Sequence, residues 1–320
     1  KLEEILPKVL CAGEDAGRLT ESGAKLLDPT GTLKAGIPMC PPEGDAGTGM
    51  VATNSVRVRT GNISAGTSIF SMVVTEKALD KVHEEIDMVT TPDGHPVAMV
   101  HCNNCTSDLN GWVSLFGEFA ERFGMKVDKN ELFGTLYKEA LSADTDCGGL
   151  LAYNYFSGEP VTGLQAGRPM FVRLPDAKFN LANFMRSHLY SAMAALKIGN
   201  DILLKEEKVQ VDSLMGHGGL FKTPVVGQQL MAAAFHSPVT VMDTASEGGA
   251  WGMAVLAAFM MEKEEGEELP DYLSEKIFAG QTGTTIAPKP EDVEGFDRVV
   301  ERYRNTLPAE KAAAQFFVSE

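Results

Sequence analysis

The chain has 320 residues and carries 28 Lys and Arg against 44 Asp and Glu, which gives a formal net charge of −16 at pH 7. With 44% hydrophobic residues, 22% charged residues and 32 glycines, the composition is that of a globular protein of about two domains, and it excludes intrinsic disorder, collagen and a coiled-coil rod. The acidic balance argues against nucleic acid and anionic membranes as partners, because both are bound through clustered Lys and Arg.

Neither a membrane span nor a signal peptide is expected. The longest apolar stretch, residues 250–261, is too short to cross a bilayer. The first five residues are neither a cationic leader nor a start at Met, so we expect a trimmed chain or a fragment. The cysteines are odd in number, which favours free thiols in a reducing compartment and hence the cytoplasm: Cys11, Cys40, Cys102, Cys105 and Cys147.

The first part of the chain predicts two β-hairpins. Residues 55–59 and 67–75 are expected to pair around a turn at 60–62, and residues 85–90 are expected to pair with 96–102. These strands would begin a mixed sheet.

Helices are predicted next, because apolar residues recur at helical spacing. They cover residues 107–123, with Ser107 or Asp108 as N-cap, 130–143 and 181–205. The following segment predicts a β-α-β-α unit, which is typical of a layered α/β protein. Its parts are a strand (209–215), a glycine turn (216–219), a helix that opens at 223–224, a strand (239–243) and a glycine-rich helix (246–261), and a surface helix is expected from residue 290 onward.

Three glycine-rich motifs could carry chemistry. In residues 41–49 one carboxylate, Asp45, stands among three glycines, as expected where backbone approaches a ligand beside an acid; alternatively, Asp45 caps a helix after a solvated turn. Residues 66–68 could direct N–H groups and hydroxyls at phosphate oxygens, or form an ordinary hairpin turn. Residues 216–219 could hold a phosphate or a flat ring, but they do not fit the Rossmann fingerprint, because Phe221 stands where its last glycine is required.

Residues 101–105, His-Cys-Asn-Asn-Cys, suggest either a metal or redox site or buried thiols at the end of a strand. Since the sequence has no second cysteine pair, we favour buried thiols. The sequence also lacks the G-x-S-x-G elbow of a Ser-His-Asp hydrolase.

Taken in order, these motifs resemble those of the FGGY-type carbohydrate kinases, most closely the xylulokinase-like branch. The motifs that carry the resemblance are Gly44-Asp45-Ala46, Gly66-Thr67-Ser68, Tyr155-Phe156-Ser157-Gly158-Glu159 and Gly216-His217-Gly218-Gly219, followed by the glycine-rich segment 247–254. The sequence departs from the family where His217 replaces the middle glycine of a triple, and where Leu220 and Phe221 replace Ala-Arg or Ala-Ser.

The resemblance implies the actin-like ATPase fold, an α/β fold in which ribonuclease-H-like domains, each a mixed β-sheet flanked by helices, surround a cleft. Since the family's first phosphate loop, Asp-x-Gly-Thr, is missing from the sequence, the chain resembles the C-terminal portion of such a kinase. Residues 1–59 would be the tail of the sugar-binding N-terminal domain, and residues 60–320 the ATP-binding C-terminal domain. The missing N-terminal domain or a second copy in a homodimer is the expected partner that covers apolar surface.

The resemblance also implies roles for single residues. Asp45 would be the general base that takes a proton from a sugar hydroxyl as it attacks the γ-phosphate of ATP. The residues expected to bind ATP are Gly66, Thr67, Ser68, Gly216, Gly218, Gly219, Phe221 and Lys222. Mg²⁺ would be held by phosphates and water, and the sugar would be a pentulose such as xylulose or ribulose. The alternatives are a nucleotide-binding actin-like ATPase and a non-catalytic module that senses a nucleotide or a sugar.

Overall fold

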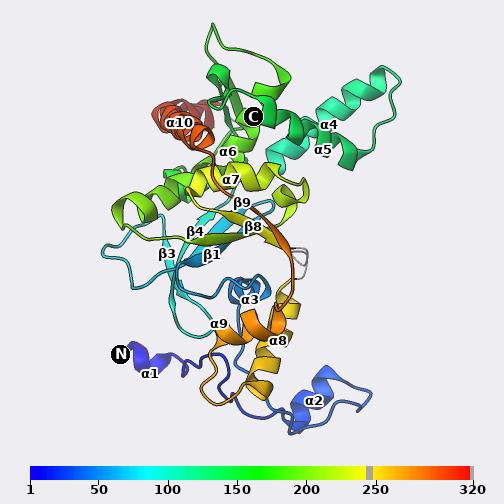
Figure 1. The fold of residues 1–320 in the computed structure, drawn as a ribbon, viewed down its shortest axis with the longest axis vertical. Helices are drawn as coiled ribbons and strands as arrows, with labels where there is room; N and C mark the ends of the chain where they lie inside the picture. Colours follow the sequence, from blue (N-terminus) through cyan, green and yellow to red (C-terminus); the bar gives the residue numbers. More distant parts are fainter. Residues whose placement is uncertain (243–247, 318–320) are drawn as a thin grey trace.

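A seven-stranded mixed sheet forms the centre of the molecule (Figure 1). The computed structural model describes residues 1–242 and 248–317, and within them the strands lie in the order β3-β4-β2-β1-β7-β8-β9. Their bounds are β1 Thr60–Ala65, β2 Ile69–Val74, β3 Asp87–Thr90, β4 Pro96–Cys102, β7 Ser213–His217, β8 Val239–Met242 and β9 Gly283–Ile286. β7 pairs in parallel with β1 and β8, whereas the other pairs are antiparallel. The predicted mixed sheet is therefore confirmed.

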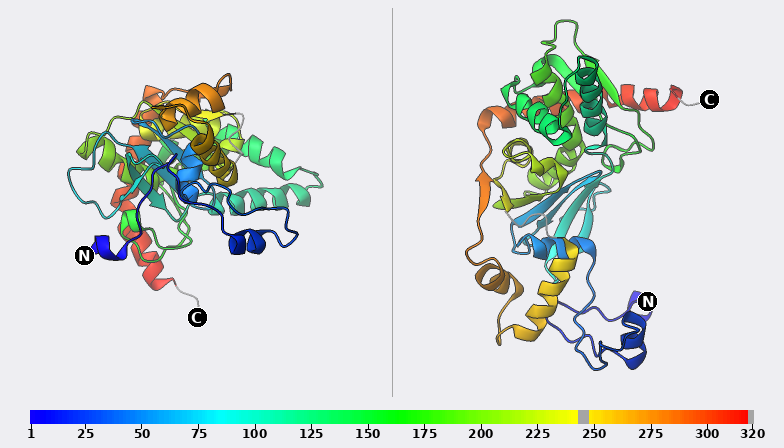
Figure 2. Two further views of the ribbon diagram at one scale, coloured as in Figure 1. Left: turned by 90° about the horizontal axis from the view of Figure 1, so that it is seen from below. Right: turned by 90° about the vertical axis from the view of Figure 1, so that its right-hand side faces the viewer.

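Helices cover both faces of this sheet (Figure 1). One face carries α6 (Leu181–Asp201) and α7 (Val226–Phe235) with α10 (Pro290–Phe316) packed against them, and the other carries α3 (Asp45–Ala52), α8 (Gly249–Glu262) and α9 (Leu269–Tyr272). Outside these layers lie α1 (Leu2–Ile5), α2 (Glu21–Leu27), α4 (Ser107–Arg122), α5 (Lys129–Glu139) and a two-stranded sheet of β5 (Leu150–Tyr153) and β6 (Met170–Arg173). The α4–α5 hairpin projects from one end, and the N-terminal segment lies at the other (Figure 2). In the described ranges, no helix has the length and apolar character needed to cross a membrane.

α6 is enclosed by the sheet, β5 and α10, and two of its buried charged residues are paired with residues of α10. Its residues from Ala182 to Asp201 are buried. Lys197 pairs with Asp297 of α10 at 2.7 Å, and Arg186 pairs with Asp292 of α10. Because buried charges are tolerated when they are paired, these contacts fix α10 on α6. The helix predicted from residue 290 is therefore present as α10. Only its outer face is on the surface, because its inner face packs against α6.

α3 and α8 meet at glycines on the opposite face of the sheet. A Cβ on Gly252 of α8 would lie 2.1 Å from the carbonyl oxygen of Thr48, and a Cβ on Gly249 would lie 2.8 Å from Oγ1 of Thr48. Glycine is required here because any other residue would push the two helices apart. α8 thereby sets the position of α3, whose first residue is Asp45.

The first predicted hairpin is wrong in its boundaries. β1 pairs with β2 through a turn at residues 66–68, whereas a turn at 60–62 after a strand at 55–59 was expected. Gly61 lies inside β1, where a Cβ would be 2.1 Å from the carbonyl oxygen of Met72. This glycine permits close pairing of two strands and does not mark a turn.

The boundaries of the elements around residues 216–219 also differ from the prediction. β7 begins at Ser213 and continues through Gly216 and His217, so the first half of the predicted glycine turn is strand. The strand predicted over residues 239–243 and the helix predicted over residues 246–261 are present as β8 and α8. Three of their predicted residues lie outside the described ranges: Asp243, Ser246 and Glu247.

The predicted helices over 107–123, 130–143 and 181–205 are confirmed as α4, α5 and α6. The N-cap of α4 was predicted wrongly, because Thr106 occupies this position instead of Ser107 or Asp108. The carboxylate of Asp108 points to side chains, since Oδ2 accepts a hydrogen bond from Nε1 of Trp112 at 3.1 Å.

We expect Gly252→Ala to lower the free energy of unfolding by about 1–3 kcal/mol, because the added methyl group has no space beside the backbone of α3. Gly111→Ala is the matched control. A Cβ at this exposed position in α4 meets nothing within 4 Å, and the change should stabilise the protein by about 0.5–1 kcal/mol. Urea unfolding followed by circular dichroism measures both. An unchanged midpoint for Gly252→Ala would contradict the close packing of α3 on α8.

Candidate active site

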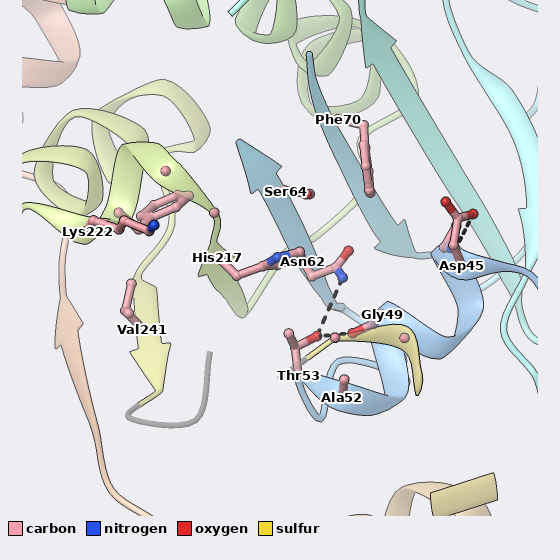
Figure 3. Close-up of a pocket in the computed structure, with 16 residues that line it drawn as sticks. Asp45, Gly49, Ala52, Thr53, Asn62, Ser64, Phe70, His217, Lys222 and Val241 are labelled. Carbon is pink, nitrogen blue, oxygen red and sulfur yellow. Dashed lines mark hydrogen bonds between the residues drawn. The ribbon is translucent and has the colours of Figure 1, made fainter. Parts of the chain in front are cut away.

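A cavity of about 610 Å³ lies between α3, β1 and the segment that follows β7 (Figure 3). We call it the Asp45 cavity. Its lining residues are Asp45, Ala46, Gly49, Ala52, Thr53, Asn62, Ser64, Phe70, His217, Gly218, Gly219, Phe221, Lys222, Val241, Gly248 and Gly249. Asp45 and Lys222 lie on opposite sides of it. The fold thus brings the predicted acid and the predicted glycine motif to one cavity.

Asp45 stands at the start of a helix, with Gly44 as the N-cap residue. Its Oδ1 accepts a hydrogen bond from the N–H of Ala46 at 2.9 Å, and the side chain is exposed. The hydroxyl of Thr48 donates to the carbonyl oxygens of Gly44 and Asp45, at 3.1 and 3.0 Å, and so fixes the first turn. Asp45 is therefore an accessible carboxylate on a fixed backbone, and the N-cap position of the helix belongs to Gly44.

The glycines of the motif at residues 216–219 differ in the contacts that they permit. A Cβ on Gly216 would lie 2.5 Å from the ring of Phe221, and a Cβ on Gly218 would lie 2.5 Å from the carbonyl oxygen of Ala65. Gly218 also has a φ of +99°, which favours glycine. Gly219 has only a contact at 3.9 Å and borders the cavity. Gly216 and Gly218 are thus required by packing, and Gly219 is the one of the three that leaves space for a ligand.

The turn of residues 66–68 lies at the end of β1, beside Gly218, but it is not among the residues that line the Asp45 cavity. The N–H of Gly66 donates to the carbonyl oxygen of Ser68 at 2.9 Å and is therefore not free for a phosphate. Thr67 is exposed, and Ser68 is half-buried. These two residues are the members of the turn that could contact a ligand.

A second cavity of about 540 Å³ adjoins the first, since Gly219 and Lys222 line both. We call it the Tyr137 cavity. Its other lining residues are Thr106, Asn110, Asn130, Phe133, Tyr137 and Thr223. The sequence analysis did not identify these residues. The sequence feature that could have indicated this cavity is the pair Thr106 and Asn110, which are polar residues one helical turn apart at the start of an otherwise amphipathic helix.

Phe221 and Lys222 are neighbours with different surroundings. Phe221 is 7% exposed and belongs to the apolar core, so its ring supports the glycine motif. Lys222 is exposed where the two cavities meet, and among the lining residues described it is the one Lys or Arg. A cation at this point would attract an anionic ligand that spans both cavities.

Asn62 and His217 bring polar atoms to the inner wall of the Asp45 cavity (Figure 3). Asn62 is 1% exposed, and its Nδ2 reaches Oγ1 of Thr53 at 3.5 Å. Oδ1 of Asn62 and Nε2 of His217 have no hydrogen-bond partner among the described residues. Burial lowers the pKa of His217. The imidazole is therefore neutral at pH 7 and adds no positive charge to the cavity.

In the described residues, no three His, Cys, Asp or Glu side chains, those of the cysteine motif included, could hold a metal ion. Cys102 and Cys105 are free and buried at the end of β4, as predicted. Burial raises the pKa of Cys105 to about 12 and that of Cys102 well above its usual value. Both side chains are thus protonated thiols that fill the core.

Residues 61–261, more than half of the chain, match a family model described as the C-terminal domain of the FGGY family of carbohydrate kinases. The chain belongs to this family. The resemblance carried by the ordered glycine motifs is therefore confirmed. No curated protein matches the chain.

Solved structures of FGGY kinases have the same fold. A ligand-bound xylulose kinase from Lactobacillus acidophilus has a TM-score of 0.75 at 17% identity, and the match covers 99% of this chain and 60% of that one. A xylulose kinase from Rhodospirillum rubrum has a TM-score of 0.75 at 19% identity, with 98% and 58% covered. A gluconate kinase from Lactobacillus acidophilus has a TM-score of 0.73 at 18% identity, with 99% and 60% covered. The chain thus spans about 60% of the length of these structures. The predicted actin-like ATPase fold is confirmed.

We expect the imidazole of His217, which replaces a glycine of the FGGY motif, to titrate below its usual value of 6.5, because burial lowers its pKa. The unfolded chain then binds more protons than the native one as the pH falls through 6.5, so His217 makes the native state less stable toward acid. Histidine ring resonances in the NMR spectrum measure the pKa in the native and the urea-unfolded chain, and His217→Asn assigns the signal. A native pKa at or above the unfolded one would show that the ring is solvated.

Proposed function

We propose that the protein phosphorylates a sugar hydroxyl with ATP, and that Asp45 is the general base. The observation that carries this proposal is that Gly219 and Lys222 line both cavities, while Asp45 lines the first. A nucleotide that spans both would present its terminal phosphoryl group to Asp45. Membership of a family of carbohydrate kinases supports a phosphotransferase.

In this proposal the nucleoside lies in the Tyr137 cavity and the phosphates extend toward Asp45. Phe133 and Tyr137 offer aromatic surface to a base, and Asn110 offers an amide for hydrogen bonds. Lys222 stands where the phosphates would pass.

We assign the remaining predicted nucleotide residues by their surroundings. Gly219 would approach the phosphates directly, and Thr67 and Ser68 would contact them from the turn at the end of β1. Gly66, Gly216, Gly218 and Phe221 would give the two turns their shape.

The reaction moves one phosphoryl group and one proton. The sugar oxygen forms a bond to the γ-phosphorus while the bond from that phosphorus to the bridging oxygen breaks, and ADP leaves. Asp45 accepts the proton of the attacking hydroxyl. The residues of both cavities hold the reactants in line, which supplies much of the rate in phosphoryl transfer.

We propose Mg²⁺ as the cation that accompanies ATP, where it would neutralise charge on the phosphates. Within residues 1–242 and 248–317, no three His, Cys, Asp or Glu side chains could hold a metal ion directly. The carboxylate of Asp45 and the unpartnered Oδ1 of Asn62 are oxygen acceptors beside the cavity. They suit a hydrated Mg²⁺, because this ion retains several of its water ligands in protein sites.

A pentulose such as xylulose or ribulose is our proposed substrate. We also propose that residues 1–59 are the tail of a sugar-binding domain and that residues 60–320 are the ATP-binding domain. The cytoplasm is the proposed location, and an N-terminal domain or a second copy the proposed partner. ATP turnover that depends on a sugar separates a kinase from a nucleotide-binding ATPase or a sensor module.

We expect Asp45→Ala to retain Mg-ATP binding and to lower sugar-dependent turnover of the natural full-length protein by about 10²–10⁴-fold, as loss of a general base does. Glu43→Ala is the control, because it removes a neighbouring acid that does not line the Asp45 cavity. Steady-state assays with a panel of pentuloses measure the effect. Near-normal turnover in Asp45→Ala would rule out the assignment.

We expect Gly219→Val to weaken Mg-ATP binding to the chain by at least about tenfold with little change in stability, because its side chain enters the space that both cavities share. Gly111→Val adds the same group at an exposed position of α4 that lines neither cavity, and should leave binding unchanged. Isothermal titration calorimetry measures the affinities. Equal affinities for the two variants would place the nucleotide elsewhere.

A further inference from the structure

Glu159 is a buried carboxylate that the proposed function leaves unused. It ends the motif of residues 155–159 and is 0% exposed. Its Oε2 accepts hydrogen bonds from the N–H groups of Asn103 and Asn104, at 3.1 and 3.3 Å, and from Nδ2 of Asn104 at 3.1 Å. Glu159 thus holds the short segment that joins β4 to α4.

The side chain of Asn104 completes this contact in the opposite direction. Its Oδ1 accepts hydrogen bonds from the N–H groups of Phe156 and Ser157, at 3.0 and 3.1 Å. Asn104 is 5% exposed, so these bonds are shielded from water. Residues 103–104 and 156–159 are therefore locked to each other by bonds in both directions, an arrangement that we call the Glu159 clamp.

The next two residues of the same segment hold the turn at the end of β1. The N–H of Cys105 donates to the carbonyl oxygen of Thr67 at 3.0 Å, and the N–H of Thr106 donates to that of Gly66 at 3.2 Å. The hydroxyl of Thr106 donates to the carbonyl oxygen of Gly66 as well, at 2.7 Å. The turn of residues 66–68 thus depends on where the clamp places residues 105 and 106.

A carboxylate is costly in such a place. Burial raises the pKa of Glu159, and its Oε1 has no hydrogen-bond partner among the described residues. An apolar residue would avoid this cost but could not accept the two N–H groups. Burial of the Glu159 carboxylate therefore lowers stability, which indicates that the clamp has a role other than stabilising the fold.

We propose that Glu159 is a positioning residue, which acts through residues 103–106 to hold Thr67 and Ser68 where they contact the phosphates of the nucleotide. This inference rests on the proposed function for the ligand, and on the hydrogen bonds described above for the clamp. It assigns a role to the motif of residues 155–159 and to the segment between Cys102 and Cys105.

The chain offers a matched control in Glu310 of α10. It is also 0% exposed, its Oε1 accepts a backbone hydrogen bond from the N–H of Arg168 at 2.5 Å, and its Oε2 lacks a partner among the described residues. Burial raises its pKa as it does that of Glu159. Glu310 bonds neither to residues 103–106 nor to the turn, so its loss should affect stability alone.

The test compares Glu159→Ala, Glu159→Gln and Glu310→Ala in two measurements. Amide hydrogen exchange without nucleotide reports the bonds made by the N–H groups of Cys105 and Thr106. Calorimetry with Mg-ATP reports the binding of phosphates. We expect Glu159→Ala to speed exchange at both amides and to weaken Mg-ATP affinity, each by at least about tenfold. Glu159→Gln should stay within a few fold of the parent, because the amide oxygen can accept the same bonds, and Glu310→Ala should lower Tm only.

Unchanged exchange and affinity in folded Glu159→Ala would overturn the inference, as would an equal loss of affinity in Glu310→Ala. Should Glu159→Ala fail to fold, Asn104→Ala opens the clamp from the other side and is judged by the same two measurements. A parent chain that binds no Mg-ATP would contradict the proposed function. Faster exchange in Glu159→Ala would still establish in that case that the clamp holds the turn.

Discussion

The contact between Gly218 and the end of β1 is the constraint on which the site depends. A Cβ on residue 218 would lie 2.5 Å from the carbonyl oxygen of Ala65, so the backbone can pass there only as glycine. β1 and β7 are parallel, and their carboxyl ends therefore lie at one edge of the sheet. The contact places residues 66–68 beside residues 218–222. The two cavities that meet at Gly219 and Lys222 follow from this arrangement.

The helices and the mixed sheet, which rest on the spacing and order of apolar segments, are predicted correctly, whereas the turn at 60–62 and the N-cap of α4 are not. The spacing of apolar residues is enough to predict α4, α5 and α6, and the order of strands and helices is enough for the mixed sheet. Asp45 stands out because an acid among three glycines is a local signal; the structure places it on a cavity, and its role as general base stays a proposal. The family follows from the order of four such signals.

Features that depend on contacts between distant segments could not be predicted. The sequence predicts Gly61 as part of a turn, but its close contact with the backbone of Met72 explains this glycine, and the contact with Ala65 explains Gly218. The Tyr137 cavity arises where α4 and α5 face residues 219–223, and no single segment carries its pattern. The burial of Glu159 is equally invisible in the sequence, because Asn103 and Asn104, its partners, come from another part of the chain.

The charge of the molecule explains why rigid backbone matters so much at this site. The chain has a net charge of −16, and Lys222 is the one Lys or Arg among the described residues that line the two cavities. One ammonium group cannot balance a triphosphate. In the proposed function, the remaining stabilisation comes from Mg²⁺ and from N–H and O–H donors on the turns. Such donors stabilise a developing charge only when they are already in place, because reorganising them would cost what they contribute. In the proposed function, the Gly218 contact and the Glu159 clamp hold these donors in place at a site where Lys222 is the one Lys or Arg among the described lining residues.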